Sequence, residues 1–407
     1  MQEVKKKSKK NNKWVRDRHQ IIRNIVSVPL YLYSRFAYKF VFPKKEDKLC
    51  GQYLVLFNHQ TSFDQFFVAL SFKKHLYFVT SEDLFSKKSI SKLITWLVAP
   101  IPFRKSTADI TAVKNCLRIV KEGGSIAMAP EGNRTYSGTT EYIKPSVASL
   151  AKSLKLPIAF FRIEGGYGAQ PRWSNKIRKG KMRGFVSKIL TFEEYKDMSK
   201  EELFDIIKTE LYVDERLDKT LFKSEKRAEF LDRVVYYCPY CELSEFYSTG
   251  NLIKCKKCGR EIEYLPDKTL KGKGFDFPHL YVKDWYDAQN DYIRNLDLNK
   301  YSETPVFEET VCFRENIYCE KKIIIDEKAQ FGIYADHFLL KTVKGDFKFT
   351  FTDVESATVL GKNKLNIYID NHIFQISGDK HFNALKYLNI YFATKTDEKT
   401  DEAFLGL

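Results

Sequence analysis

Residues 54–64 read Leu-Val-Leu-Phe-Asn-His-Gln-Thr-Ser-Phe-Asp, an apolar run that ends in a polar turn. The run predicts a buried strand, and Thr61-Ser62 predicts the cap of a helix that follows it. His59 then lies at the end of the strand, and Asp64 comes about one helical turn later. We therefore expect Asp64 to accept the imidazole Nδ1 proton and to fix the tautomer of His59.

Such a His-Asp pair is a general base without a nucleophile of its own. It suits the removal of a proton from a substrate hydroxyl, an effect worth roughly 10²–10⁴ in rate. The alternative is structural, because a histidine and an aspartate in a loop that starts a helix can serve only as capping and surface polar groups.

Strand-like and helix-like segments alternate from Gln52 to about residue 190, which predicts an α/β layered domain with a mostly parallel sheet. The expected strands are 53–57, 76–80, 125–129, 157–164 and 184–186. The expected helices are 63–72, 89–98, 108–121 and 147–154. His59 and Glu131 each follow a strand directly, at the sheet edge where sites form in such folds.

Four short motifs follow one another in this region. Residues 58–64 resemble the Asn-His-x4-Asp signature of the glycerolipid acyltransferases, the family that includes 1-acylglycerol-3-phosphate acyltransferase. Residues 101–104, Ile-Pro-Phe-Arg, are similar to the second motif of that family, which ends in a phosphate-binding arginine. Residues 129–134, Ala-Pro-Glu-Gly-Asn-Arg, are similar to the third motif, usually Pro-Glu-Gly-Thr-Arg, and residues 156–158 to the fourth.

The resemblance implies that Arg104 and Arg134 bind the acceptor phosphate, for which guanidinium forks are well suited. Either arginine alone is equally compatible with a surface ion pair. The resemblance also implies acceptor binding at Glu131, Gly132 and Asn133, although Glu131 can instead hold an arginine in place. Asn133 stands where the family usually has threonine, which makes an acceptor other than 1-acylglycerol 3-phosphate plausible.

By this resemblance, we expect a membrane-associated acyltransferase that makes phosphatidic acid. His59, oriented by Asp64, would deprotonate the free hydroxyl of 1-acylglycerol 3-phosphate as it attacks an acyl thioester of CoA or acyl-carrier protein. The step needs no catalytic metal or redox cofactor. Three alternatives stay open: another lysophospholipid or glycerol 3-phosphate as acceptor, a basic nucleic-acid-binding protein, and an inactive membrane adaptor.

The formal charge of +16 implies an acidic partner, either a nucleic acid or an anionic membrane surface, and the ordered motifs favour the membrane. Residues 1–43 join a lysine-rich start to an amphipathic segment that suits a helix lying in the membrane interface. Only eleven residues between Arg23 and Arg35 are free of charge, too few for a spanning helix. Pro29 is expected to divide the segment into two short helices. A solvated tail followed by a core helix is the alternative.

Two Cys-x-x-Cys pairs, Cys238/Cys241 and Cys255/Cys258, are separated by thirteen residues and predict a four-cysteine zinc ribbon. Four thiolates leave no coordination position for water, so the zinc is expected to be structural. No secretory signal with a cleavage site opens the chain. These features favour a reducing cytosol, with the protein peripheral on the inner face of the membrane.

The predicted domain order ends in a β-rich unit. Residues 303–395 contain short strands expected at 306–313, 317–325, 331–334, 338–341, 347–351, 365–369 and 373–376, then a helix at 381–392. This order of elements resembles a pleckstrin-homology-like barrel, with a packing or interaction domain as the alternative. The expected boundaries are 1–43 membrane-association segment, 44–192 acyltransferase domain, 193–236 helical connector, 237–265 zinc ribbon, 266–302 linker and helix, 303–395 β-rich domain and 396–407 tail.

Overall fold

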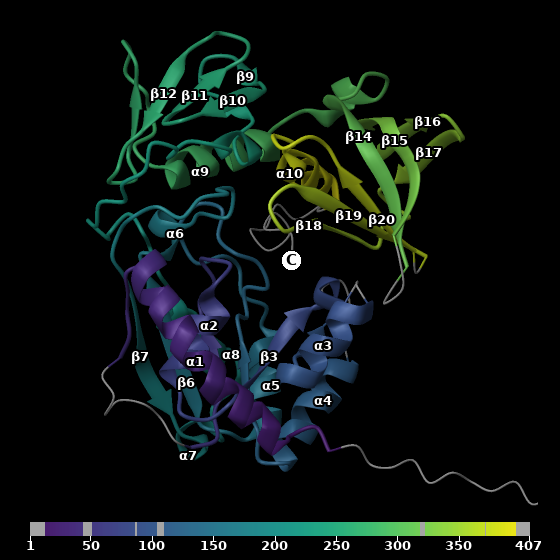
Figure 1. The fold of residues 1–407 in the computed structure, drawn as a ribbon. Coiled ribbons are helices and arrows are strands. Elements are labelled where there is room, and N and C mark those ends of the chain that lie inside the picture. Colours follow the sequence, from purple (N-terminus) through teal and green to yellow (C-terminus); the bar gives the residue numbers. More distant parts are fainter. Residues whose placement is uncertain are drawn as a thin grey trace, which may run out of the picture.

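The computed structural model describes residues 13–43, 51–85, 88–103, 110–317, 322–370 and 372–395. Figure 1 shows an α/β part built from the first half of the chain, with two β-rich parts from the second half next to it. The two β-rich parts lie on either side of the helices α9 (Val282–Arg294) and α10 (Ala384–Lys395), which contact each other.

The α/β part contains a seven-stranded sheet in the order β1-β7-β6-β2-β5-β3-β4. The pairs β6-β2, β2-β5, β5-β3 and β3-β4 are parallel, and β7 is antiparallel to β6, so the expected mostly parallel sheet is confirmed. The strands are β1 (Phe40–Val41), β2 (Leu54–Phe57), β3 (Leu76–Ser81), β4 (Ile101–Phe103), β5 (Ser125–Met128), β6 (Ile158–Glu164) and β7 (Met182–Leu190). The strands β1 and β4 were not expected, because two or three residues make no recognisable apolar run.

Both faces of this sheet are covered by helices, as a fully buried parallel sheet requires. The alternation of side chains along β2 sends Leu54 and Leu56 into one core and Val55 and Phe57 into another. The helices are α1 (Asp17–Ala37), α2 (Asp64–Ser71), α3 (Lys88–Val98), α4 (Ile110–Lys121), α5 (Ser146–Leu154), α6 (Gly166–Ala169), α7 (Phe192–Tyr195) and α8 (Lys200–Leu211). The first core contains residues of α4, α5 and α8, and the second contains residues of α2.

Three local predictions are wrong. Pro29 lies inside one continuous helix, α1, because Pro29 and Ile25 face solvent, where the carbonyl group freed by proline can be hydrated. The cap of α2 is Phe63 without a side-chain hydrogen bond, and the Thr61 hydroxyl donates to Asp64 instead. The expected helical connector is helical only to Leu211.

Beyond Leu211 the chain runs in irregular contacts along the α/β part, with one short turn, η3 (Leu231–Arg233). Besides short turns within the segment, its backbone bonds to other segments: Thr140 N donates to Val213 O over 3.0 Å, and Lys179 and Lys223 exchange two hydrogen bonds of 3.0 and 2.9 Å. These tertiary bonds replace the helical ones that the Glu, Lys and Leu spacing predicts.

The cysteine-rich part contains the two-stranded pair β8 (Tyr237–Cys238) and β9 (Glu242–Leu243). A four-stranded antiparallel sheet follows, built from β10 (Phe246–Thr249), β11 (Leu252–Cys255), β12 (Glu261–Tyr264) and β13 (Leu270–Gly272). The indole Nε1 of Trp285, on α9, donates to Tyr237 O over 2.7 Å and ties this part to the helix behind it.

The C-terminal part is a curled antiparallel sheet of seven strands in the order β17-β16-β15-β14-β20-β19-β18, with α10 packed on β18 and β19 (Figure 1). The strands are β14 (Phe307–Asn316), β15 (Lys322–Ile333), β16 (His337–Thr342), β17 (Gly345–Thr350), β18 (Ser356–Leu360), β19 (Lys364–Ile369) and β20 (His372–Ser377). Two expected strands merge into β15, and β18 was missed. The pleckstrin-homology-like identity of this part stays a prediction.

Candidate active site

The edge of the sheet at the carboxyl ends of β2 and β5 brings two of the motifs together. The two strands are parallel neighbours with Leu56 opposite Met128, so the loops that follow them start side by side. His59 lies in the first loop and Glu131 in the second. The topology alone therefore makes these two residues neighbours.

His59 and Asp64 form the pair that the spacing predicts, with Nδ1 and Oδ2 2.8 Å apart. The Asp64 side chain is fully buried, whereas that of His59 is 24% exposed, so a substrate can reach the imidazole. Asp64 Oδ2 also accepts the backbone N–H groups of Gln60 and Thr61, over 2.6 and 2.9 Å, and its Oδ1 accepts the Thr61 hydroxyl over 2.6 Å. These bonds fix the carboxylate at the start of α2, where the helix dipole favours a negative charge.

Glu131 supports the backbone of His59 through a hydrogen bond. Its Oε1 accepts the His59 N–H over 2.7 Å, and its Oε2 accepts the Glu141 N–H over 2.8 Å. Glu131 is 1% exposed, and burial raises the pKa of its carboxyl group well above the usual range. The N–H of Thr135, the residue after the third motif, donates to His59 O over 3.1 Å, so the loop after β5 bonds to both the N–H and the carbonyl group of His59.

The residues next to His59 attach the loop to β6. The Asn58 side chain exchanges two hydrogen bonds with the Ile163 backbone, of 2.8 and 2.7 Å. The Gln60 Oε1 accepts the Gly166 N–H over 2.8 Å, at the first residue of α6. A Cβ atom at Gly166 would lie 2.5 Å from that same oxygen, so glycine is needed there. The loop that carries His59 is therefore bonded both to β6 and to the start of α6, which follows that strand.

The rest of the third motif turns toward the C-terminal part of the chain. Gly132 is exposed and has a φ of +66°, a left-handed conformation that favours glycine. Asn133 and Arg134 are partly buried. Burial lowers the pKa of Arg134 to about 10, with Arg172 as the next cause and Asp64 acting in the opposite direction. The Arg134 Nη1 is buried and has no hydrogen-bond partner among the described residues.

Arg104, the other expected phosphate ligand, lies outside the described residues. The strand β4 ends at Phe103, directly before it, and runs parallel to β3.

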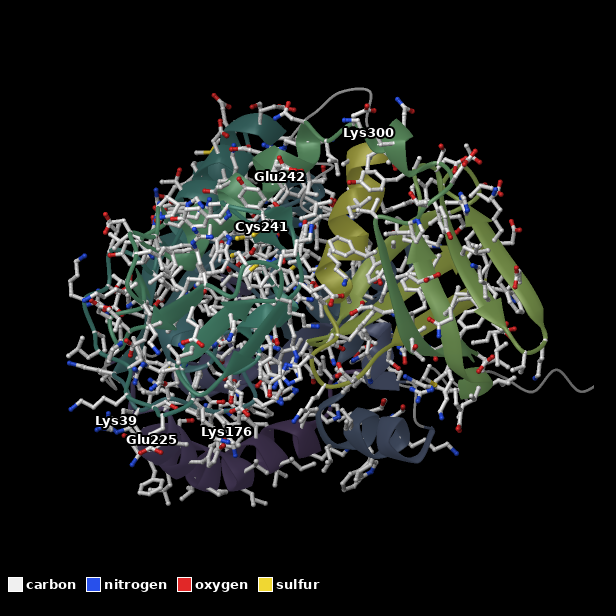
Figure 2. All side chains as sticks on the ribbon, turned by 90° about the horizontal axis from the view of Figure 1, so that it is seen from above. Lys39, Lys176, Glu225, Cys241, Glu242 and Lys300 are labelled. Carbon is white, nitrogen blue, oxygen red and sulfur yellow. The ribbon has the colours of Figure 1, made fainter. Side chains whose placement is uncertain are left out.

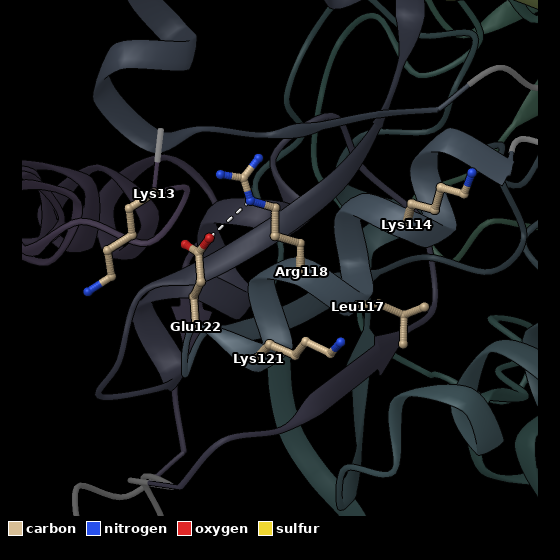
Figure 3. A pocket seen from close by; sticks show the side chains of 6 residues that line it. All are labelled: Lys13, Lys114, Leu117, Arg118, Lys121 and Glu122. Carbon is tan, nitrogen blue, oxygen red and sulfur yellow. Dashed lines mark hydrogen bonds and ion pairs between the residues drawn. The ribbon is translucent and has the colours of Figure 1, made fainter. Parts of the chain in front are cut away.

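A hollow in the surface lies at the other edge of the sheet (Figure 3). It is bounded by residues at the carboxyl end of α4, which directly precedes β5, so it lies at the amino end of that strand. The lining side chains are Lys13, Lys114, Leu117, Arg118, Lys121 and Glu122. Glu122 accepts the backbone N–H groups of Trp14 and Val15, over 2.6 and 2.8 Å, which anchors the chain before α1. The hollow therefore has no contact with the His59 edge.

The four cysteines of the two pairs come together and can hold a metal ion. Their sulfur atoms all lie within 4.8 Å of one another, and Figure 2 shows sulfur atoms close to Cys241. The Cys238–Cys258 and Cys241–Cys255 separations are 3.9 and 4.0 Å. Tetrahedral zinc with Zn–S bonds of about 2.3 Å places its sulfurs about 3.8 Å apart, so the donor set fits zinc.

Sequence reasoning missed the supporting residues of the site. Thr135 and Arg172 donate to backbone carbonyl groups of the motif loops, and the Glu141 N–H donates to the Glu131 carboxylate. None of the three belongs to a recognisable pattern. Arg172 is 2% exposed and bonds to segments far away in the sequence. No local signal identifies a buried arginine of this kind.

Comparison with known proteins agrees with the motifs. No curated protein matches the chain. Among solved structures, the chain is similar to the 1-acyl-sn-glycerophosphate (LPA) acyltransferase PlsC from Thermotoga maritima, with 18% identity and a TM-score of 0.40, over 48% of this chain and 82% of that chain. Residues 41–163 match the model of the family described as Acyltransferase. The matched segment contains His59, Asp64 and Arg134.

Proposed function

We propose that the protein transfers a fatty acyl group from a thioester, acyl-CoA or acyl-carrier protein, to the free hydroxyl of 1-acylglycerol 3-phosphate. The observation that carries the proposal is the His59–Asp64 pair, 2.8 Å apart, with a partly exposed imidazole on a buried and fully bonded carboxylate. The pair lies within the segment that matches the acyltransferase family. The name of the PlsC structure describes an enzyme acting on the same acceptor.

In the proposed reaction, His59 Nε2 takes the proton of the acceptor hydroxyl as its oxygen attacks the thioester carbonyl carbon. The new C–O bond forms and the C–S bond breaks, and the thiolate leaves with the proton returned by the imidazolium. Asp64 stabilises the imidazolium and keeps Nδ1 protonated. Glu131 and Thr135 keep the His59 backbone in position, so that the imidazole is oriented before substrate binds.

The acceptor phosphate is proposed to bind Arg104 and Arg134. Support comes from Arg134, whose Nη1 is buried without a partner among the described residues. A buried donor of this kind is costly unless a ligand satisfies it. A phosphate oxygen would supply the missing acceptor and offset the charge.

Two further parts of the proposal concern the membrane surface and the metal ion rather than the reaction. We expect α1 to lie on an anionic membrane surface, on its cytoplasmic side, which would bring the lysophospholipid to His59. The four-cysteine cluster is expected to hold a structural zinc ion. In the described part of the chain, no helix is both long and apolar enough to cross a bilayer.

The test is acyl transfer to 1-acylglycerol 3-phosphate, measured for the wild type and for His59→Ala with each donor. Loss of the general base should lower the rate roughly 10²–10⁴-fold, with an unchanged circular dichroism spectrum. The matched control is His372→Ala, a histidine on the C-terminal sheet with a side chain 58% exposed, which should keep full activity. Equal activity of wild type and His59→Ala would refute the mechanism. Activity only with glycerol 3-phosphate or another lysophospholipid would move the proposal to that acceptor.

A further inference from the structure

One buried arginine joins the third motif to the C-terminal sheet. The Arg172 Nη1 donates to Arg134 O over 3.1 Å, while its Nε donates to Gly361 O over 3.1 Å and its Nη2 to Val359 O over 2.8 Å. Gly361 begins the turn between β18 and β19. Because a single guanidinium group bonds to both backbones, the β18–β19 turn is held directly beside Arg134.

Lys362 is the second residue of that turn and is partly buried. Its Nζ donates to Asn175 Oδ1 over 2.7 Å, an oxygen that Arg233 Nη1 also approaches to 3.3 Å. Burial, together with the nearby charges of Arg134 and Arg233, lowers the pKa of Lys362 to about 8. Lys362 and Arg134 are thus two cations in one partly desolvated region.

Neither cation has an acidic partner in the described part of the chain. No carboxylate there lies within 4.0 Å of either the Lys362 Nζ or the Arg134 guanidinium, and Lys362 Nζ donates to the neutral amide of Asn175. Like charges that share a region of low dielectric repel each other, and an anion between them would offset both. Arg134 contributes, in addition, the unpartnered Nη1 donor.

We infer that Lys362 and Arg134 together form the binding site for the anionic headgroup of the acceptor. The C-terminal sheet then completes the acceptor pocket, and Lys362 selects lipids that carry a phosphate over neutral ones. This inference rests on the proposed function for the identity of the acceptor. Arg172 is a positioning residue, because it acts by holding the turn against the third motif.

The experiment measures the KM for 1-acylglycerol 3-phosphate and kcat in wild type, Lys362→Ala and Lys362→Arg. Loss of a charge-assisted hydrogen bond should raise the KM of Lys362→Ala about tenfold, while kcat changes less than about twofold. Lys362→Arg keeps the charge and should recover most of the affinity. The matched control is Lys344→Ala, an exposed lysine in the β16–β17 turn at the opposite edge of the same sheet, which should leave both constants unchanged.

Binding is also measured without turnover, by titrating 1-acylglycerol 3-phosphate and the neutral 1-acylglycerol into His59→Ala with and without Lys362→Ala. The charged lipid should lose about tenfold in affinity and the neutral lipid none. An unchanged KM and Kd for Lys362→Ala in an active enzyme would overturn the inference and leave the proposed function intact. If the wild type shows no transferase activity, and Lys362→Ala still weakens binding of the charged lipid, the anion site is supported and the proposed function is refuted.

Discussion

Glu215 is a buried carboxyl group next to the loop that carries His59. It is 2% exposed, its Oε1 accepts the Gly165 N–H over 2.6 Å, and its Oε2 has no partner in the described chain. Burial raises its pKa to about 7, while Lys268 partly opposes this and Asp218 adds to it. The fold therefore favours the protonated acid, whereas the unfolded chain ionises near pH 4.5.

This shift predicts a pH-dependent loss of stability. The contribution of Glu215 is fully present below pH 4.5 and is lost progressively as the pH rises to about 7, by an amount on the order of 3 kcal/mol. Glu215→Gln keeps the acceptor for Gly165 and cannot ionise. Urea unfolding from pH 4.5 to 8 should show the wild type losing about 3 kcal/mol more than the variant. Contributions shared by both proteins, including that of the cysteine cluster, cancel in this difference.

The control for this measurement is Glu225→Gln, an exposed carboxylate on the surface seen in Figure 2. It should follow the wild-type pH profile throughout. A wild-type profile parallel to that of Glu215→Gln would mean that Glu215 ionises in the fold as it does in the unfolded chain.

At the scale of the element, α1 presents an apolar stripe to solvent. Ile21, Ile25, Val28, Leu32 and Phe36 follow helical spacing and are each 57–90% exposed. The opposite face is fixed to the domain, partly by Arg23, whose Nη2 donates to the carbonyl groups of Ala69 and Phe72 on and after α2. Leu93 and Trp96 of the neighbouring α3 are also more than half exposed. The folded domain thus leaves an apolar face that a lipid surface can cover.

The stripe predicts membrane binding that depends on α1. The combined variant Ile25→Ser, Leu32→Ser, Phe36→Ser removes apolar contacts worth about 1.5–3 kcal/mol each when fully buried in lipid. Flotation with anionic liposomes should therefore recover at least tenfold less of this variant than of the wild type. Val343→Ser is the control, since Val343 is 90% exposed, as Phe36 is, but lies in the C-terminal sheet. Equal flotation of the α1 variant and the wild type would leave α1 as an ordinary surface helix.

At the scale of the whole molecule, the cysteine cluster and the C-terminal sheet share one hydrophobic core. Cys238, Trp285 and Tyr387 belong to a single cluster of buried side chains, which also includes Tyr136 and Trp173 from the α/β part. Tyr136 comes two residues after Arg134 in the sequence. Loss of order at the cysteines would therefore spread toward Arg134.

This shared core predicts that metal supports activity only through folding. The purified protein should hold about one zinc ion per chain, and Cys241→Ser should lose it and unfold at a lower temperature. Cys312→Ser, at a lone cysteine on β14, should keep both the metal and the stability. During chelation, activity should fall only in step with the circular dichroism signal. An immediate loss of activity in a fully folded protein would instead point to a catalytic metal.

The sequence by itself determined the features in which all partners are close in the chain. These features are the β2–loop–α2 unit, the contact of His59 with Asp64 and the two cysteine pairs. Each depends on a spacing of a few residues, and the local backbone geometry keeps residues at such spacings close in space. The parallel sheet also followed from local patterns, because each buried strand and each amphipathic helix has its own periodicity.

Only the tertiary structure decided what surrounds the pair. It placed the Glu131 carboxylate where it accepts the His59 N–H, and it kept α1 continuous through Pro29. It also decided that the chain after Leu211 forms irregular contacts with other segments. It also brought Gly361 to Arg172 across 189 residues, and with it the β18–β19 turn to Arg134. No local pattern records such contacts, because they depend on how separately formed units pack and on which buried polar groups each unit leaves for the other to satisfy.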